Sequence, residues 1–228
     1  IAIERLVIEP VVTGGKRRIG HLAASADIRR GRAMIKLKAD AAAGDRLALL
    51  LDAEPDGNRF DLDADLNAPA GGVFGQIIGT SRPVELHVRG DGRWTHWQGK
   101  FLGRVSGLQI AELALSNDAG NFALAGQLAL SSITHGKLQR LTAPVLRVRG
   151  DGKLAGRKFQ GSLHLASQAL TADFSGSADL ASNRFNPLNI DAQLLQPRAL
   201  FPNMTGRNIF LKARLDGPFG AANFDYLL

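Results

Sequence analysis

The chain has 228 residues, no cysteine, and 28 Lys and Arg against 21 Asp and Glu, which gives a net charge of +7. The absence of cysteine excludes a disulfide framework and a thiolate metal site, and an apolar content of 45% excludes a mainly disordered chain. No run reaches the roughly 18–20 apolar residues that a membrane-spanning helix needs. Because the sequence starts at Ile1 without a basic and apolar leader and ends on the apolar residues FDYLL, we expect a segment of a longer protein, with any membrane anchor outside it.

Apolar and polar residues alternate along most of the chain. The alternation is clear at Ile35, Leu37 and Ala39, which lysines separate, and it is longest over residues 170–180. Because successive side chains of a strand point to opposite faces, such runs predict strands with one apolar and one polar face. The residues expected to line the apolar face are Leu47, Leu49, Leu51, Phe60, Leu62, Leu66, Val84, Leu86, Val88, Phe122, Leu124, Leu128, Leu130, Leu163, Leu165, Phe174, Ile190, Leu194, Ile209, Leu211 and Leu215.

Two segments depart from strict alternation. Leu50 stands on the polar side of its run, as do Ala123 and Ala125. We expect these strands to be covered on both faces or to lie against a helix.

Turn signals separate the runs every 10–15 residues or so, which is typical of an antiparallel meander. Glycine in these signals supplies the positive φ that tight turns require. The predicted turns are at residues 55–57, 90–92, 117–120, 150–152 and 216–218.

An internal repeat surrounds three of these turns. The segment PVELHVRGDGR over residues 83–93 is similar to PVLRVRGDGK over 144–153, and IFLKARLDGP over 209–218 is a weaker copy. Helical spacing precedes each copy, at residues 73–79, at Leu138 and Leu141, and at Leu200, Phe201 and Met204. We expect one continuous segment over residues 1–228 with repeat units of about 60 residues, at approximately 30–92, 93–152 and 153–217.

A repeating one-sided sheet can close into a barrel, pack on a second sheet, coil as a solenoid or curl into an open trough. The chain lacks the short ladder repeats of a solenoid, and its one Tyr and two Trp cannot form the aromatic girdles of a membrane barrel. The predicted fold is therefore all-β: a long curled antiparallel sheet that forms an open hydrophobic groove, with a few short helices.

The residues of catalytic chemistry form no recognisable pattern. The five histidines lie far apart, and Asp61, Asp63 and Asp65 fall on a strand with Leu66 where a calcium loop needs glycine. The Arg-Gly-Asp tripeptide at residues 89–91 recurs at 149–151, as a structural repeat would. We expect no catalytic residues, no metal site and no cofactor, so the protein is predicted not to be an enzyme.

A basic cluster lies at residues 16–18 and 29–32. Binding of nucleic acid would require aromatic side chains between these charges, and none is near, so nucleic acid is not an expected partner. A solvated face explains the cluster best, and attraction to an acidic phospholipid surface is the next explanation.

The phrase LNAPAGGVFGQIIG over residues 66–79, followed by PVELHVRGDGRWTHWQG over 83–99, resembles the TamB family of translocation and assembly module subunits, which belongs to the AsmA-like superfamily. The resemblance extends over about residues 40–220 through repeat character. The positions that carry it are Ala68, Pro69, Gly71, Gly72, Gly90, Gly92, Trp97 and Gly99.

The resemblance implies a location in the periplasm of a Gram-negative bacterium, with an inner-membrane anchor outside this segment. It implies that the groove conducts phospholipid acyl chains between inner and outer membrane and supports outer-membrane biogenesis, beside a barrel subunit of the TamA type. An alternative is a chaperone-like scaffold for outer-membrane proteins such as autotransporters, in which sheet edges pair with nascent barrel strands. A surface adhesin built of β-repeats is a third possibility.

Overall fold

The computed structural model describes residues 2–8, 18–29, 32–41, 44–77, 80–201, 203 and 208–227. These residues form an all-β structure of antiparallel strands with two short α-helices, as the alternation predicts. The chain divides into two compact units, Ile1–Glu112 and Leu113–Leu228, and it passes from one to the other within strand β8 (Leu108–Asp118).

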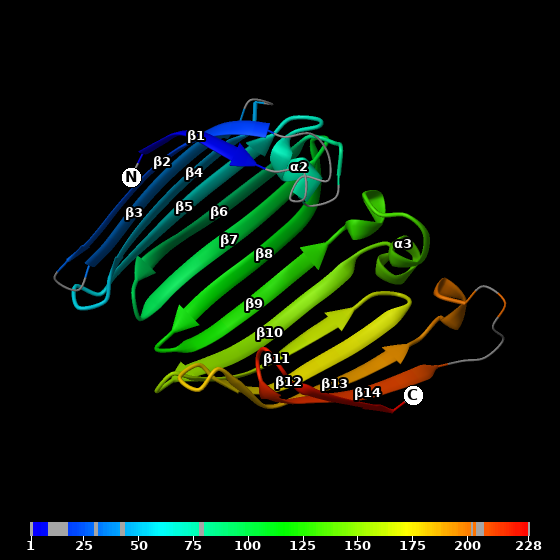
Figure 1. The fold of residues 1–228 in the computed structure, drawn as a ribbon. Coiled ribbons are helices and arrows are strands. Elements are labelled where there is room, and N and C mark those ends of the chain that lie inside the picture. Colours follow the sequence, from blue (N-terminus) through cyan, green and yellow to red (C-terminus); the bar gives the residue numbers. More distant parts are fainter. Residues whose placement is uncertain are drawn as a thin grey trace. The chain divides into compact units, whose positions relative to one another are not determined.

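Unit 1 is an antiparallel meander in which each strand pairs with the next strand along the chain (Figure 1). Its one helix, α2 (Val73–Ile77), lies in the connection between the fifth and sixth strands. The strands are β1 (Ala2–Ile8), β2 (Arg18–Arg29), β3 (Arg32–Ala41), β4 (Arg46–Glu54), β5 (Arg59–Ala68), β6 (Val84–Arg93) and β7 (His96–Val105).

Unit 2 repeats this plan. Helical turns again interrupt the meander, with η1 (Leu130–Ser132) and α3 (Gly136–Thr142) after β9, and η2 (Pro197–Ala199) after β13. The strands are β9 (Asn121–Leu128), β10 (Leu146–Ala155), β11 (Lys158–Ala166), β12 (Leu170–Asp179), β13 (Arg184–Leu194), β14 (Ile209–Pro218) and β15 (Asn223–Leu227). Helical connections thus follow β5, β9 and β13, at intervals of four strands.

The strand registers place the apolar residues of unit 1 on one face. In antiparallel pairs, directly opposite residues share a face, so a row of paired residues crosses the sheet on one side. One such row contains Leu37, Leu49, Ala64, Val88 and Phe101 on successive strands from β3 to β7. The row beside it, one residue further along each strand, contains Lys36, Leu50, Asp63, Arg89 and Lys100.

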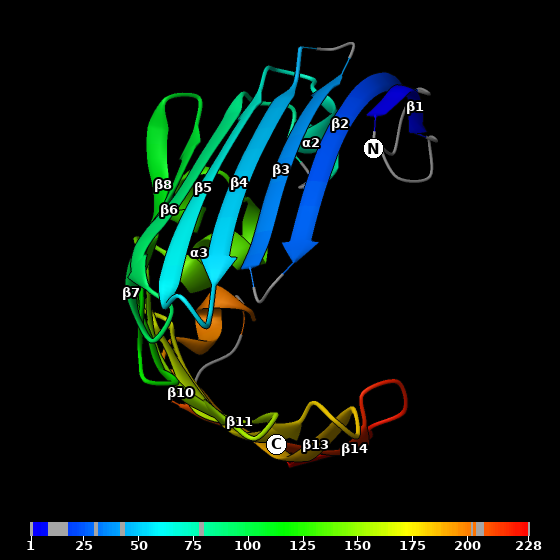
Figure 2. The same ribbon diagram turned by 90° about the vertical axis from the view of Figure 1, so that its left-hand side faces the viewer.

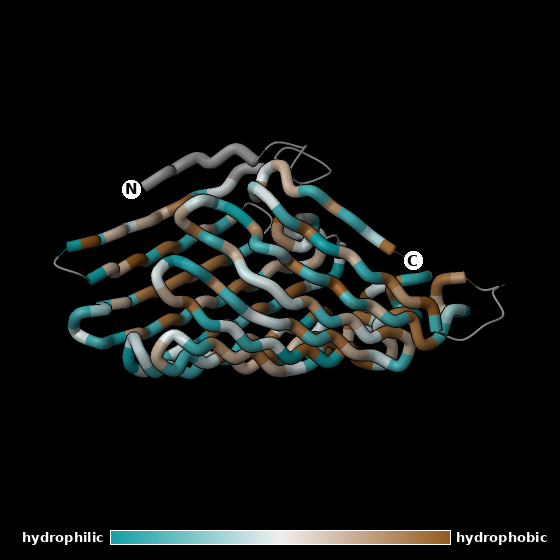
Figure 3. Tube along the Cα trace, turned by 90° about the horizontal axis from the view of Figure 1, so that it is seen from below, coloured by the Kyte–Doolittle hydropathy of each residue, from teal (hydrophilic) through white to brown (hydrophobic). Residues whose placement is uncertain are grey.

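The same separation of faces holds in unit 2. Leu124, Gly150, Leu163, Phe174, Ile190 and Ala213 are paired in sequence from β9 to β14. Hydrophobic and hydrophilic positions alternate along the strands in Figure 3. In each unit, the described pairings run in chain order and do not join the first strand to the last, so neither meander closes into a barrel.

Three of the five predicted turns are wrong. Gly90-Asp91-Gly92 and Gly150-Asp151-Gly152 lie inside β6 and β10, and residues 216–218 lie in β14. The chain instead reverses at residues 94–95 and 156–157. The turns predicted at 55–57 and 117–120 are confirmed, at residues 55–58 and 119–120.

The departures from alternation also differ from expectation. Ala123 and Ala125 are exposed, and Leu50 lies half-buried between Lys36 and Asp63 of the neighbouring strands. Among the described residues, no helix covers any of these three side chains. Leu130 is not on a strand, because β9 ends at Leu128 and the chain continues into η1.

The short helical segments are found close to their predicted positions. Helix α2 occupies most of residues 73–79, of which 78 and 79 lie outside the described residues, and α3 contains Leu138 and Leu141. The third helical turn lies at Pro197–Ala199, just before the predicted Leu200 and Phe201, and Met204 is outside the described residues.

Candidate functional site

The candidate site is the apolar face of each unit. In unit 1 it comprises the residues of β2 to β7 that lie on the same face as the row containing Leu37 and Leu49. In unit 2 it comprises the residues of β9 to β15 that lie on the same face as the row containing Leu124 and Leu163. From β3 to β7 in unit 1 and from β9 to β15 in unit 2, no charged residue occupies a paired position on the apolar face of the described strands, whereas Arg18 at the start of β2 pairs with Ile8 in phase with that face. Such a face either binds apolar ligands or is covered by a second layer of the protein. The solvent exposure of its side chains shows whether a second layer covers it.

Most side chains on these faces are only half-buried. Of the residues predicted to line the groove, only Val84 and Leu194 are buried, at 1% and 6% exposure, and the others are intermediate. A side chain packed between two layers is normally fully buried. The described parts of each unit therefore leave the middle of the apolar face without a second layer.

One end of the apolar face in unit 1 lies against helix α2. The buried row at this end consists of Ala68, Val84 and Val105, which are paired across β5, β6 and β7, and the buried Val73 begins the helix. Since α2 also contacts β5, it covers this last row and leaves the rows beyond it open (Figure 2).

A buried carboxylate holds α2 in place. Asp45 is fully buried, and its two carboxylate oxygens accept hydrogen bonds from the backbone N–H groups of Val73 (2.9 Å) and Phe74 (3.0 Å). These are first-turn N–H groups that have no partner inside a helix. A helix of five residues is too short to be stable alone, so this anchor and the packing of Val73 fix its position.

The Ala-Pro-x-Gly-Gly phrase has a local explanation in this anchor. Gly71 adopts a φ of +72°, which favours glycine. A Cβ on Gly72 would lie 2.5 Å from a carboxylate oxygen of Asp45, so only glycine lets the chain pass so close to the buried carboxylate.

The opposite end of this face carries an aromatic cluster. Phe60 and Trp97 are both paired with Gly92, and their rings stack with centroids 4.9 Å apart. Trp94, which is 40% exposed, lies against Phe60 at 6.2 Å. Gly90 makes room for the Phe60 ring, which a Cβ would approach to 3.2 Å, and Gly92 has a φ of +138° and would place a Cβ 2.6 Å from the His96 carbonyl oxygen.

Unit 2 has the same two ends. Near its helices, Leu146, Val148, Ala172 and Leu194 are buried, and the Arg140 guanidinium donates a hydrogen bond to the Ala199 carbonyl (2.9 Å), which ties α3 to η2. At the other end, Leu154 and Phe159 are about 39% exposed.

Glycine and aromatic side chains again meet at this open end. A Cβ on Gly152 would lie 2.5 Å from the Phe159 ring, and one on Gly161 would lie 3.1 Å from it. Further along the same end, Phe185 is paired with Gly217 and packs against Phe219 at 4.6 Å. The Gly-Asp-Gly repeat therefore marks places where rings from adjacent strands cover a strand on its apolar side.

Ion pairs stabilise the polar face of unit 1. Arg32 forms a bidentate pair with the buried Asp52 (2.8 and 2.7 Å), and Arg59 lies 3.0 Å from the same carboxylate. The Arg32 hydrogen bonds, together with the positive charges of Arg32 and Arg59, hold the pKa of Asp52 below its usual value. The carboxylate thus links β3, β4 and β5.

The other polar residues singled out in the sequence are also part of ion-paired strand faces. Asp63 and Asp65 lie on β5 and pair with Arg89 (3.6 Å) and His87, and His164 pairs with Asp173 (2.6 Å) in unit 2. Within the described ranges, no three His, Cys, Asp or Glu side chains gather in a way that could hold a metal ion. Of the basic cluster, Lys16, Arg17 and Arg30 lie outside the described residues.

The structure brings the predicted apolar residues together on two faces, apart from Leu130. Several residues of these faces were not predicted, among them Trp97, Phe101, Phe185 and Phe224. For Trp97 and Phe101 the available signal was their alternation in phase with Gly99 and Gly103. No helix among the described residues is both long enough and apolar enough to cross a membrane.

No protein family model, no curated protein and no solved structure matches this chain. The resemblance of residues 66–99 to the TamB family therefore stands on the sequence phrase itself.

Proposed function

We propose that the apolar faces bind phospholipid acyl chains, and that the chain is a periplasmic segment of a TamB-like envelope protein that conducts these chains between inner and outer membrane. The observation that carries the proposal is a continuous, partly exposed apolar face in each unit, with no charged residue at the paired positions from β3 to β7 and from β9 to β15. In this proposal the sheet curls around the acyl chain as an open groove, without catalysis.

The energetics suit a passing ligand. Moving a 16-carbon chain out of water at about 0.8 kcal/mol per methylene stabilises it by roughly 13 kcal/mol. The aliphatic side chains that would contact it, such as Leu49, Leu86 and Leu163, are alike in size and polarity, so no single position would trap the chain. An acyl chain could therefore move along the face in small steps.

The capped and open ends supply a direction for entry. Helices cover one end of each apolar face, and the other end is open beside the aromatic residues of the Gly-Asp-Gly strands. Tryptophan favours the boundary between apolar and aqueous surroundings. We propose that acyl chains enter beside Trp94 and Trp97 in unit 1.

The two tryptophans of the chain make this testable by fluorescence. The protein is incubated with phosphatidylcholine vesicles whose acyl chains carry bromine at mid-chain, separated from the vesicles, and its emission is measured. In the Trp94→Phe variant only Trp97 on the apolar face reports, and in the Trp97→Phe variant only Trp94 in the turn reports. We expect stronger quenching of Trp97, because it lies on the apolar face next to Phe60.

A matched pair of substitutions separates the two faces. Leu86→Asp places a charge on the apolar face, and Leu102→Asp places it on the polar face of the adjacent strand β7, opposite His87. We expect Leu86→Asp to abolish quenching and lipid co-purification, measured by mass spectrometry, and Leu102→Asp to leave both unchanged. Equal lipid content in the two folded variants would contradict the proposal.

A second candidate is the chaperone-like scaffold that pairs a sheet edge with nascent outer-membrane strands. The observation that favours it is β15, which pairs with β14 and exposes Phe224, Tyr226 and Leu227 by more than half. Exposed apolar edge strands favour pairing with another strand. Crosslinks of a nascent barrel protein to β15, with none to the apolar faces, would support this candidate over lipid conduction.

A further inference from the structure

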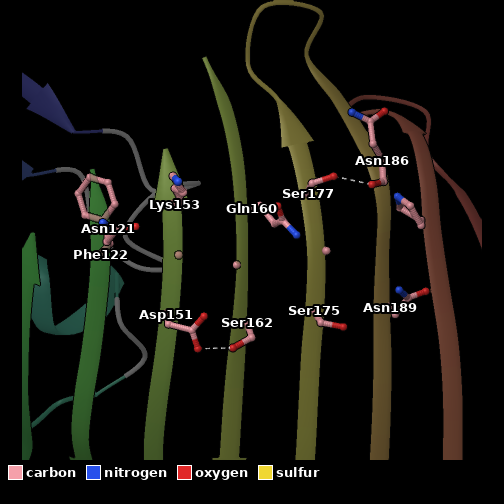
Figure 4. Close-up of a pocket in the computed structure, with 14 residues that line it drawn as sticks. Asn121, Phe122, Asp151, Lys153, Gln160, Ser162, Ser175, Ser177, Asn186 and Asn189 are labelled. Carbon is pink, nitrogen blue, oxygen red and sulfur yellow. Dashed lines mark hydrogen bonds between the residues drawn. The ribbon is translucent and has the colours of Figure 1, made fainter. Parts of the chain in front are cut away.

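A polar hollow lies on the opposite face of unit 2 from the proposed lipid contacts. It has a volume of about 640 Å³ and extends over β9 to β13 (Figure 4). Its lining includes the short side chains of Ser162, Ser175 and Ser177 and the longer side chains of Lys153, Gln160 and Asn189.

The strand registers define the shape of the hollow. Asp151, Ser162, Ser175 and Asn189 are paired in sequence across four strands, and Lys153, Gln160 and Ser177 form a second row two residues away. At about 4.8 Å between strands and 3.4 Å per residue, the two rows cover an area of roughly 14 by 7 Å. Gly152, Gly161 and Gly176 lie between the two rows, in phase with the apolar face.

Hydrogen-bonding groups in the hollow remain available to a ligand. Ser162 donates to the Asp151 carboxylate (2.6 Å), and Ser177 donates to the Asn186 carbonyl (2.6 Å). Among the described residues, the side chains of Gln160, Ser175 and Asn189 have no partner. Amide and hydroxyl groups that both donate and accept therefore face the hollow together.

The charge of the hollow restricts the ligand. Asp151 and Lys153 carry opposite charges, and the other side chains named above are neutral, so the site has no excess charge to attract an anion or a cation. The polar face of unit 1 differs, because it is occupied by ion-paired Arg, Lys, Asp and Glu. A neutral ligand rich in hydroxyl and amide groups fits the chemistry of the hollow.

We propose that this hollow binds a neutral oligosaccharide of two or three sugar rings, with Gln160, Ser175 and Asn189 hydrogen-bonding its hydroxyl or acetamido groups. Phe122 is the one aromatic residue among those that line the hollow, and its position in β9 is in phase with the apolar face, so we expect weak binding, with a dissociation constant of about 0.1–10 mM. Since the hollow and the apolar face lie on opposite sides of the sheet, a bound glycan would leave the lipid contacts free.

The test is a titration of the full ¹⁵N-labelled chain with N,N′,N″-triacetylchitotriose and, separately, with maltotriose, followed by NMR. The amides of Gly152, Gly161 and Gly176 are the reporters, because these residues lie between the two polar rows. We expect saturable shifts at these glycines with at least one trisaccharide.

Variants connect the shifts to the hollow. Ser175→Gln fills part of the hollow and should weaken binding at least tenfold, and the Gln160→Ala, Asn189→Ala double variant should do the same by removing hydrogen-bonding groups. Gln127→Ala, on the same face of β9 but outside the hollow, should change nothing. The proposal is overturned if neither sugar gives saturable shifts up to about 20 mM, or if the two hollow variants bind as the unaltered protein does.

Discussion

The two units share an apolar face and differ in their polar faces. In unit 1 the polar face is crossed by ion pairs, such as Arg32 with Asp52 and Lys100 with Glu112 (2.8 Å). In unit 2 ion pairs such as His164 with Asp173 also occur, but beside them the central strands carry serine, asparagine and glutamine around the hollow. The apolar pattern therefore determines the meander, whereas the outward positions can take different chemistry in each unit.

The largest effect of a substitution on stability is expected at Gly176 in unit 2. A Cβ there would lie 2.3 Å from the Pro187 carbonyl oxygen, where both neighbouring strands shift register around β13. Because backbone must move, we expect Gly176→Ala to lower the free energy of unfolding by about 3 kcal/mol or more. Urea denaturation measures it, and hydrogen exchange should locate the loss in unit 2.

Gly220→Ala is the matched control for this change. A Cβ on Gly220 meets nothing within 4 Å, in the turn before β15. If both alanine variants are equally stable, the close approach of Pro187 does not restrict position 176.

The next largest effect is expected in unit 1, at Asp45. Asp45→Ala leaves the N–H groups of Val73 and Phe74 without acceptors in a buried place, so we expect a loss of about 2–3 kcal/mol. Urea denaturation checks the loss, with Asp56→Ala in the exposed turn before β5 as the control. Increased hydrogen exchange confined to α2 and its neighbouring strand ends would show that the helix itself is released.

Acid should affect the two units through different carboxylates. Asp52 has a lowered pKa because of Arg32 and Arg59, and Asp179 in unit 2 has a lowered pKa because the backbone N–H groups of Ser182 and Ala181 donate to it. A carboxylate with a lowered folded-state pKa stabilises the fold above its unfolded-state value, about 3.9, and the stabilisation disappears as pH falls below that value.

The urea midpoint of the unaltered protein should therefore fall between pH 5 and pH 2. Asp52→Asn should reduce both the midpoint at pH 7 and its dependence on pH. High salt should weaken the effect of Asp52→Asn more than that of Asp179→Asn, because salt screens ion pairs more than hydrogen bonds to backbone. An acid dependence unchanged in Asp52→Asn would show that the ion pair adds no stability.

The smallest effect is expected at Arg89, within the repeated Arg-Gly-Asp tripeptide. Its guanidinium lies 3.6 Å from Asp63 on an exposed surface, and such pairs contribute little. Arg89→Ala should change the free energy of unfolding by no more than about 0.5 kcal/mol, measured by urea denaturation. A larger loss would indicate that ion pairs on unit 1 act as a network.

The strands and their faces could be predicted well from the sequence. Alternation with period two is a local pattern, so it can be recognised without knowing which strands lie side by side. The prediction failed at Gly90-Asp91-Gly92 and Gly150-Asp151-Gly152, where glycine was read as a turn residue. At Gly90 and Gly152 the cause is a ring on a neighbouring strand, Phe60 or Phe159, and no local pattern shows which strand will lie alongside.

For the candidate sites too, local patterns could be recognised in the sequence, whereas contacts between distant residues could not. The apolar residues could be assigned to a face from spacing alone, although Leu130 was misplaced because its alternation continues past the end of β9. Asp45 was missed because its partners lie 28 and 29 residues away. The hollow was missed because it requires the register of five strands.

The order of strand pairing has a consequence for how the chain acquires its structure. Within each unit, every strand bonds only to the strands immediately before and after it, so no segment must wait for a distant one to be synthesised. Short sequence separation between contacting residues favours rapid folding. Strands that stay unpaired while the chain folds expose edges that promote aggregation. The meander can thus assemble vectorially, hairpin by hairpin, as the polypeptide emerges.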